Sequence, residues 1–370
     1  MMHENGNGSS EEKPAIRPAI LADEWTLYYY ASCIRKILVG LTGSAYGTIL
    51  VGPPGPTTET ILYPSVDFIE HPEIKLRLFA SKNRHLLFEK LSRNKPTLLH
   101  GFWPGDMKLL SFLSKKLEIP AVVTFFEPPR KRHLSSIPNS AILAASSEPI
   151  YQSILSGAGK FKPQVMCVPL GTFVEESQFC FDNLNQTTSI VVCEDLKNAH
   201  DYEPLLDAVR HLLAEGFEFS LAIMGQGPAE RAIRKQINNL GLTYVVALVP
   251  PLHPVRPIFQ GMDIFIHLKD RRRCNLALME AMSVGLAVAG CADSTTGLMQ
   301  NEKTALLFDS MEEMSIYACL KQLLSKHELA RTLAQNARQH LQTHHSVSQM
   351  VDGYIEAYTT ALKTQTPAQE

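Results

Sequence analysis

The sequence predicts an α/β protein made of two doubly wound parallel-sheet domains in tandem, with a ligand cleft between them. Short, continuously apolar segments alternate with amphipathic segments over almost the whole chain, as expected when helices cover both faces of a parallel sheet. A polar, aperiodic stretch at residues 173–187 interrupts this alternation and is predicted to be an interdomain linker. The length of 370 residues suits two domains of ordinary size.

Composition and charge argue against several other classes of protein. A hydrophobic content of 45% with 19% charged residues is typical of a soluble globular protein. The net charge of −2 provides no general attraction to nucleic acid, so we expect no nucleic-acid partner. The longest apolar run, residues 33–54, contains Arg35, Lys36 and several glycines, which disfavours a transmembrane span. We therefore expect a cytoplasmic protein with at most peripheral membrane contact.

The cysteines indicate neither a metal site nor a disulfide framework. Seven cysteines are scattered along the chain, and none forms a C-x-x-C pair. An odd, unpatterned set fits a reducing compartment. We expect no metal and no cofactor.

The N-terminal half contains the first predicted domain. Residues 1–14 are polar and rich in Gly, Ser and Glu, which predicts a disordered tail. Residues 15–172 are predicted to form a Rossmann-like domain. Its strands are expected at residues 15–22, 47–54, 97–103, 121–126, 140–146 and 164–171, and its helices at 24–41, 106–119 and 148–159.

The same alternation restarts after the linker. Residues 188–345 are predicted to form a second Rossmann-like domain, and residues 346–370 a helix that crosses back to the first domain, followed by a tail. Carboxyl ends of parallel strands from both sheets are then expected to face the cleft. Strands are expected at residues 189–194, 219–225, 244–250, 263–267 and 287–292, and helices at 201–216, 229–241 and 275–285.

Residues 263–288 carry the most informative motif, DIFIHLKDRRRCNLALMEAMSVGLAV. Without a gap, they resemble the D-V-F-V-x-P-S-x-x-E-x-F-G-x-x-x-x-E-A-M-A-x-G-x-P-V stretch of the group 1 (family 4) GT-B glycosyltransferases. MGQGP at residues 224–228 is similar to the G-x-G-P turn of the same family. The resemblance implies a GT-B fold with an N-terminal acceptor side and a C-terminal donor side. It also implies a retaining, metal-independent transfer of sugar from a nucleotide-sugar donor to an acceptor, which could be a saccharide or lipid-linked.

Some of the family's site residues are matched in this sequence, and others are replaced. Glu280 matches the second carboxylate of the family's E-x7-E pair, which binds the ribose hydroxyls of the donor. Gly225 and Gly227 match the turn that shapes the pocket floor. Arg272 stands where the family has the first carboxylate, and Asn275 where it has the glycine of Phe-Gly.

The cations of the family's donor site are also replaced. The family has an Arg and a Lys after the first strand of this domain, and fixed cations of this kind stabilise a diphosphate leaving group. Here the Arg position falls on Glu194 or Asp195. The Lys position falls near His200, or on Lys197 if the loop is shifted.

Two hypotheses follow for the Arg271–Arg273 run. In one, Arg272 and Arg273 neutralise a donor phosphate from the other side of the pocket, and Arg272 takes part in catalysis. In the other, Arg272 pairs with Glu194 and fills the vacated pocket. The first predicts a divergent glycosyltransferase, and the second a catalytically inactive GT-B module that acts in binding or scaffolding.

Two further features have both a functional and a structural interpretation. His100 ends a predicted strand and is a candidate catalytic or substrate-contacting residue, although a lone histidine there can equally be structural. The basic run at residues 130–133 is expected in a surface loop. The alternative is a patch for an anionic acceptor or a lipid head group.

Overall fold

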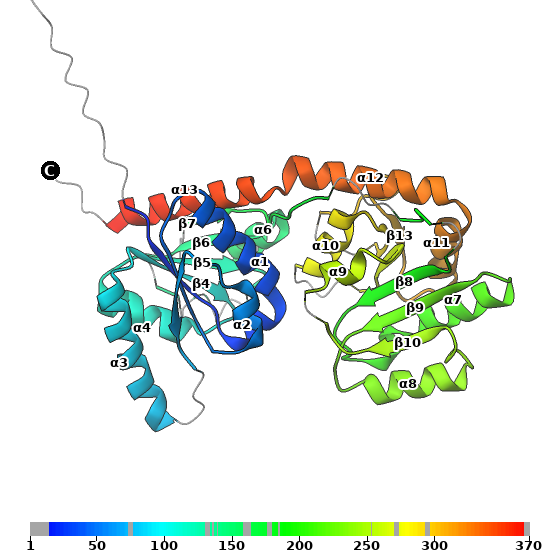
Figure 1. Ribbon diagram of the computed structural model, residues 1–370, viewed down its shortest axis with the longest axis horizontal. Coiled ribbons are helices and arrows are strands. Elements are labelled where there is room, and N and C mark those ends of the chain that lie inside the picture. Colours follow the sequence, from blue (N-terminus) through cyan, green and yellow to red (C-terminus); the bar gives the residue numbers. More distant parts are fainter. Residues whose placement is uncertain are drawn as a thin grey trace, which may run out of the picture.

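The computed structural model describes residues 15–72, 77–129, 134, 137–138, 140–157, 164–175, 180–183, 186–252, 254–269, 274–292 and 297–365. Within these residues the chain forms two separate parallel sheets, each with helices packed on it (Figure 1). The predicted architecture of two doubly wound α/β domains is confirmed.

The N-terminal sheet has the strand order β3-β2-β1-β4-β5-β6-β7, and every pairing in it is parallel. The order reverses between β1 and β4, which makes this the topological switch point of the sheet. Its strands are β1 (Pro18–Leu21), β2 (Thr48–Gly52), β3 (Val66–Glu70), β4 (Leu98–Trp103), β5 (Ala121–Phe125), β6 (Ile142–Ala145) and β7 (Gln164–Cys167). Its helices are α1 (Glu24–Gly43), α2 (Pro56–Ile61), α3 (Arg77–Asn94), α4 (Met107–Leu117) and α6 (Glu148–Gly157).

The C-terminal sheet has the strand order β10-β9-β8-β11-β12-β13, again parallel throughout, with its switch point between β8 and β11. Its strands are β8 (Thr188–Cys193), β9 (Phe219–Met224), β10 (Val246–Val249), β11 (Ile264–His267), β12 (Ala287–Cys291) and β13 (Leu306–Phe308). Its helical elements are η1 (Ala199–Asp201), α7 (Glu203–Ala214), α8 (Glu230–Asn239), α9 (Arg256–Phe259), α10 (Leu276–Val284), α11 (Glu313–Ser325) and α12 (His327–His344).

Burial on both faces explains why the strands are continuously apolar. In β1, Ala19 packs into the core on one face, with α3 and α4, while Ile20 packs into the core on the other face, with α1. In β8, Val191 and Val192 are likewise divided between two cores. Successive side chains of a strand point to opposite faces, so a strand covered on both faces is apolar at most of its positions.

The chain crosses between the domains at two places that lie side by side. Helix α13 (Val347–Gln365) follows α12 and packs on α1, β4, β5 and β6 of the N-terminal domain (Figure 1). At the junction Thr172 forms a parallel bridge with Ser346, and the Thr172 N–H donates to the carbonyl of His345 at 2.8 Å. A side chain at Gly171 would lie 2.5 Å from the Ser346 carbonyl oxygen, so glycine allows this close approach.

Three elements of the N-terminal domain, β3, α2 and α3, were not among those expected from the sequence. Strand β3 is half exposed, and α3 carries many charged residues, so neither shows the continuous apolar run of a central strand or the stripe of a buried helix. Among the described residues, no helix is long and apolar enough to cross a membrane.

Candidate functional site

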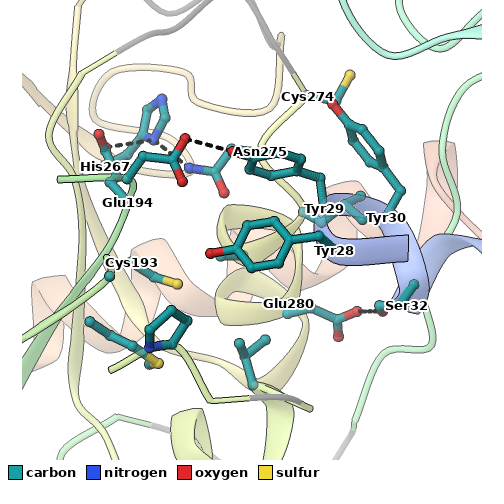
Figure 2. A pocket seen from close by; sticks show the side chains of 18 of the residues that line it. Tyr28, Tyr29, Tyr30, Ser32, Cys193, Glu194, His267, Cys274, Asn275 and Glu280 are labelled. Atoms are coloured by element: carbon teal, nitrogen blue, oxygen red, sulfur yellow. Dashed lines mark hydrogen bonds and ion pairs between the residues drawn. The ribbon is translucent and has the colours of Figure 1, made fainter. Parts of the chain in front are cut away.

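A cavity of about 150 Å³ lies between the two domains, at the carboxyl ends of β8, β9 and β11 (Figure 2). It adjoins the β8–β11 switch point, where open α/β sheets generally bind ligands. One wall comes from Tyr28–Ser32 of α1, and the opposite wall comes from the ends of the three strands and the start of α10. We call it the interdomain cavity. Small-molecule sites usually measure roughly 300–1,000 Å³, so the interdomain cavity is smaller than a usual site of this kind.

Three consecutive tyrosines close the cavity from the side of α1. Tyr30 stacks on Phe126 with ring centroids 3.8 Å apart, which anchors it in its own domain. The Tyr29 hydroxyl donates to Asp195 Oδ2 at 3.1 Å, and Gln226 Nε2 donates to the Tyr28 hydroxyl at 2.8 Å. Two of the three tyrosines therefore make hydrogen bonds across the domain boundary and hold the wall in place.

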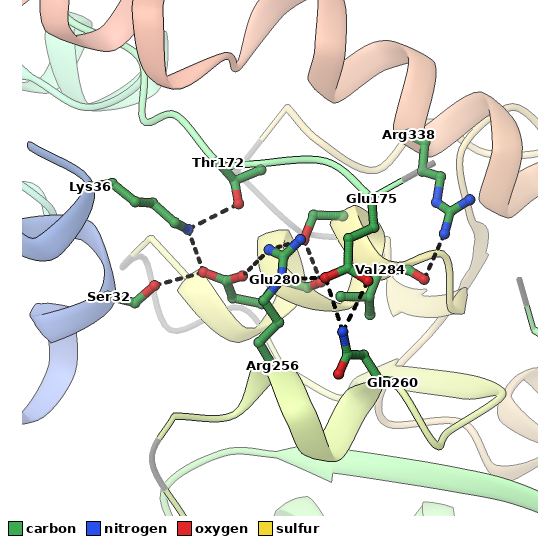
Figure 3. Close-up of polar contacts among 10 residues, drawn as sticks. Ser32, Lys36, Thr172, Glu175, Arg256, Gln260, Glu280, Val284 and Arg338 are labelled. Atoms are coloured by element: carbon green, nitrogen blue, oxygen red, sulfur yellow. Dashed lines mark hydrogen bonds and ion pairs between the residues drawn. The ribbon is translucent and has the colours of Figure 1, made fainter. Parts of the chain in front are cut away.

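Glu280 occupies the floor of the cavity and is only 3% exposed. Ser32 Oγ donates to its Oε1 at 2.6 Å, Lys36 Nζ donates to the same oxygen, and Arg256 Nη1 donates to Oε2 at 3.0 Å (Figure 3). Burial raises the pKa of this carboxyl, but Lys36, Ser32 and Arg256 outweigh burial and bring the pKa below its ordinary value. Glu280 is therefore ionised, and both of its oxygens already have donors.

The network around Glu280 extends to the chain that links the domains. Lys36 Nζ also donates to Thr172 Oγ1 at 2.9 Å. Arg256 Nε donates to Glu175 Oε1 at 2.9 Å, and Gln260 Nε2 donates to both oxygens of Glu175 at 3.0 Å (Figure 3). The cluster thus joins α1, α9, α10 and the first interdomain crossing.

Glu194 directly follows β8 and lies in the C-terminal wall. The backbone N–H of Lys269 donates to its Oε1 at 3.1 Å, and His267 Nδ1 lies 3.7 Å from the same oxygen. Asn275 Nδ2 lies 3.0 Å from His267 Nδ1 (Figure 2). Asn275 also caps α10, because its side-chain oxygen accepts from the Leu278 N–H at 3.2 Å. Glu194 and Asn275 are brought together here by contacts within their own domain.

The two predicted floor glycines are required by a close approach of two loops. A Cβ at Gly225 would lie 2.0 Å from the Glu194 carbonyl oxygen, and one at Gly227 would lie 2.2 Å from that of Leu196. The turn after β9 therefore packs directly on the backbone that follows β8. Gly225 lines the cavity, whereas Gly227 does not.

Lys197 and His200 stand apart from the cavity. Lys197 Nζ lies 3.3 Å from Asp195 Oδ2, and His200 Nδ1 lies 2.6 Å from Glu203 Oε2 with its side chain 77% exposed. Neither residue lines the cavity. In this conformation they are surface residues of the C-terminal domain.

His100 lies within β4 rather than at its end, and it points into the core rather than the cleft, contrary to the expectation from the sequence. It is completely buried, with Nδ1 2.7 Å from the Tyr358 hydroxyl and Nε2 2.8 Å from Thr124 Oγ1. Thr124 in turn donates to the Tyr354 hydroxyl at 3.2 Å, so Thr124 accepts from Nε2–H and Tyr358 donates to Nδ1. Burial lowers the pKa of His100 to about 3. The residue fastens α13 to the N-terminal sheet.

Arg271, Arg272 and Arg273 lie outside the described residues, as do residues 130–133. The hypothesis that Arg272 pairs with Glu194 therefore stays a prediction. The described residues that line the cavity include three carboxylates, Glu194, Asp195 and Glu280, and one lysine, Lys269.

Sequence reasoning missed the partners of Glu280. Lys36 is 244 residues from Glu280 in the sequence and Arg256 is 24 residues from it, and neither belongs to a motif. One signal was available, because Lys36 falls between Ile34 and Ile37 on the apolar side of a predicted helix. A lysine buried among aliphatic residues needs a partner. Among the described residues, no group of three or more His, Cys, Asp or Glu side chains could hold a metal ion.

Comparisons with solved structures define the fold. A glycosyltransferase from Rickettsia africae superposes with a TM-score of 0.77 over 95% of this chain and 99% of that chain, at 14% identity. Anabaena HepE in complex with UDP and glucose gives a TM-score of 0.73 over 92% and 98% of the two chains, at 13% identity. The protein therefore has the GT-B fold of these glycosyltransferases.

The family comparison concerns the C-terminal domain. Residues 187–326 match the family model described as glycosyl transferases group 1. The C-terminal domain is thus similar to this family over most of its length, in agreement with the resemblance of residues 263–288.

Two curated relatives of the chain are bacterial glycosyltransferases. The colanic acid biosynthesis glycosyltransferase WcaL of Salmonella typhimurium is 33% identical over 97 residues, which is 24% of this chain and 24% of that protein. The O-antigen chain mannosyltransferase C of Escherichia coli is 18% identical over 275 residues, 70% of this chain and 71% of that protein. The match to WcaL thus spans about a quarter of the length of either protein.

Proposed function

We propose that this protein is a glycosyltransferase that binds a nucleotide-sugar donor in the interdomain cavity and transfers the sugar to an acceptor hydroxyl. The observation that carries the proposal is the ionised Glu280 on the cavity floor, beside the switch point of a group 1 domain. Anabaena HepE, with the same fold, holds UDP and glucose. The transfer retains the anomeric configuration and needs no metal, as the resemblance implies.

In this proposal Glu280 binds the ribose of the donor by exchanging partners. A carboxylate accepts hydrogen bonds from two neighbouring hydroxyls, but Oε1 is occupied by Ser32 and Lys36 and Oε2 by Arg256. Ribose hydroxyls replace Ser32 and Lys36, while Arg256 keeps Glu280 ionised. The tyrosine wall moves with α1, which enlarges the cavity to the size that a nucleotide sugar needs.

The diphosphate needs cations, because it carries the negative charge that develops as the glycosidic bond breaks. The described lining has three carboxylates against Lys269, whose Nζ lies 2.6 Å from Asp201. Lys36, once released from Glu280, is a cation next to the bound donor. Arg272 and Arg273, which precede the cavity-lining Cys274 in the sequence, are the second source of positive charge in this proposal.

The alternative function is a catalytically inactive GT-B module that binds a partner. The observation that favours it is the small cavity, with both oxygens of Glu280 already hydrogen-bonded and carboxylates at Glu194 and Asp195. In this alternative the Lys36–Glu280 pair is a permanent structural link that replaces the donor.

Calorimetry with UDP, GDP, ADP and their sugars decides between the two. The transferase proposal expects one nucleotide to bind, and expects Glu280→Gln to weaken that binding by about 10- to 100-fold, because charge-assisted hydrogen bonds to hydroxyls are lost. The matched control is Glu230→Gln, an exposed residue at the start of α8, which should leave binding unchanged.

If none of the nucleotides binds, the transferase proposal fails and the inactive module remains. For the nucleotide that does bind, NMR of the product with its natural or a surrogate acceptor reports the anomeric configuration, and added EDTA tests metal independence. An inverted product would refute the retaining mechanism.

A further inference from the structure

Three histidines meet at the junction of α12 and α13, where the two interdomain crossings lie side by side. His340 and His344 are one turn apart on α12, and their ring centroids are 5.0 Å apart. The ring of His345 lies 5.7 Å from that of His340. We call these three residues the histidine cluster. None of them lines the interdomain cavity, so the proposed donor site makes no use of them.

His345 fastens the first crossing to the second. Its Nδ1 lies 2.8 Å from the carbonyl oxygen of Leu170. A carbonyl only accepts hydrogen bonds, so Nδ1 carries the proton of the neutral ring and a second proton would bind at Nε2. The backbone carbonyl of His345 in turn accepts from the Thr172 N–H at 2.8 Å. Both the ring and the backbone of this residue therefore hold residues 170–172.

The helical chain is interrupted at the same residue. Helix α12 ends at His344, and His345 has φ −136° and ψ 36°, which are not helical values. Helix α13 begins with its own capping box, because the Gln349 N–H donates to Ser346 Oγ at 3.2 Å and the Ser346 N–H donates to Gln349 Oε1 at 3.3 Å. Each helix is complete without the other, so residues 345–346 can act as a hinge between them.

Positive charge is disfavoured in the histidine cluster. Burial lowers the pKa of His340 and of His345, and repulsion from the neighbouring rings lowers both further. The Leu170 carbonyl favours the charged form of His345 but does not offset burial. Among the described residues, no carboxylate lies within ion-pair distance of the three rings. A ring released into water regains an ordinary pKa of about 6.5, so the released form gains population as the pH falls below that value.

The other charged groups around the cluster do not respond to the same change of pH. Lys36 and Glu175 belong to the network around Glu280, and the pKa values of its two carboxyls lie below 4.5. Arg338 donates to the backbone carbonyl at the end of α10. The charged groups on the elements packed around the cluster are thus Lys36 of α1, Glu175 of the first crossing, Arg338 of α12 and the exposed Asp352 of α13.

The geometry points to an acid-sensitive hinge, in which protonation of the histidine cluster releases the His345 ring from Leu170, separates the two crossings and lets the domains turn relative to each other. The interdomain cavity has one wall from each domain, so this movement widens it. The inference goes beyond the proposed function and holds whether the protein transfers a sugar or only binds a partner.

Hydrogen–deuterium exchange at about pH 7.5 and about pH 5.5 tests the hinge on the full chain, with each rate divided by the intrinsic rate at that pH. The opening of residues 170–172 should increase by about 5- to 30-fold on acidification, because one or two histidines return to their ordinary pKa. Small-angle X-ray scattering on the same samples should show a larger radius of gyration at the lower pH.

The double variant His340→Gln/His345→Asn should abolish this increase. The side-chain amide of asparagine donates to the Leu170 carbonyl from the place of Nδ1 but takes up no proton. His200→Gln, at an exposed side chain, is the matched control and should keep the increase. If thermal unfolding shows that the double variant does not fold, His340→Gln alone, which leaves the Leu170 bond in place, should reduce the increase by at least about threefold.

Four results would overturn the inference: no increase in the wild type, an increase that persists in the folded variants, an unchanged radius of gyration, or an equal increase in β4. Exchange in β4 reports on unfolding of the whole N-terminal domain, in which His100 is buried and neutral. An increase confined to residues 170–172 therefore separates the hinge from a general loss of stability in acid.

Discussion

The ammonium group of Lys36 in α1 and the carboxylate of Glu280 in α10 form an ion pair across the domain interface. Their side chains are 8% and 4% exposed, and they are separated by 244 residues in the sequence. Desolvation of two charges is costly, so such a pair persists only where further hydrogen bonds complete it. Thr172, Ser32 and Arg256 supply these bonds. The pair occupies the position where the proposed donor places its ribose.

A double-mutant cycle should show strong coupling between these two residues. Lys36→Met and Glu280→Gln each leave one buried polar partner behind, whereas the double variant removes both charges together. We expect a coupling energy of about 1–3 kcal/mol in the free energy of unfolding, measured by urea denaturation. A coupling below about 0.5 kcal/mol would mean that the pair does not form in solution.

The same pair should make stability depend on pH at the acid end. The pKa of Glu280 lies below its ordinary value of 4.5 in the folded protein, so its contribution is complete above that value and is lost as the pH falls through the folded pKa. The control is Glu230→Gln, because the carboxylate that this substitution removes is exposed rather than buried.

Lys36→Met should change the affinities for a nucleoside and for a nucleoside diphosphate in opposite directions. If Lys36 competes with ribose for Glu280 and then moves to the diphosphate, its removal strengthens binding of the free nucleoside and weakens binding of the nucleoside diphosphate. Calorimetry of the two ligands measures both effects on one variant, and we expect each change to be about 3- to 30-fold. Two changes in the same direction would contradict the exchange of partners.

Gly225→Ala should destabilise the C-terminal domain. The added Cβ would lie 2.0 Å from the Glu194 carbonyl oxygen, and backbone cannot give way as a flexible side chain can. We expect a loss of about 2–4 kcal/mol, the range of severe core disruptions. Gly43→Ala is the matched control, because no atom lies within 4 Å of the added Cβ, and alanine favours the helix by about 0.5–1 kcal/mol. If the two variants are equally stable, the turn after β9 lies farther from the backbone after β8 than it does in this structure.

His100→Gln should flatten the pH dependence of stability between about pH 6.5 and 4. Burial holds the pKa of His100 near 3, against an ordinary value of 6.5. In this range the unfolded chain takes up a proton that the folded protein does not, so His100 lowers the free energy of unfolding by about 1.4 kcal/mol for each pH unit of acidification. Urea denaturation over this range measures the slope. His200→Gln, at a side chain that is 77% exposed, should keep the wild-type slope.

The fold was predictable because its signals are local. A strand covered on both faces is mostly apolar, a helix repeats every 3.6 residues, and both patterns can be read over short windows. Strand β3 and helix α3 escaped prediction for the same reason, since half-exposed elements lack these patterns. The positions of Glu280, Gly225 and Asn275 in the site also followed from local motifs.

The sequence by itself determined that two parallel sheets form, where their strand ends lie, and that Glu280 and Gly225 come to the same edge of the second sheet. Only the tertiary structure decided which partners these groups have. Lys36 reaches Glu280 because helices from two domains pack against each other, and His100 turns inward because α13 returns to cover its strand. Contacts of this kind depend on how whole elements dock. A hydrogen bond between residues 244 or 258 positions apart has no signature in the local periodicity of either segment.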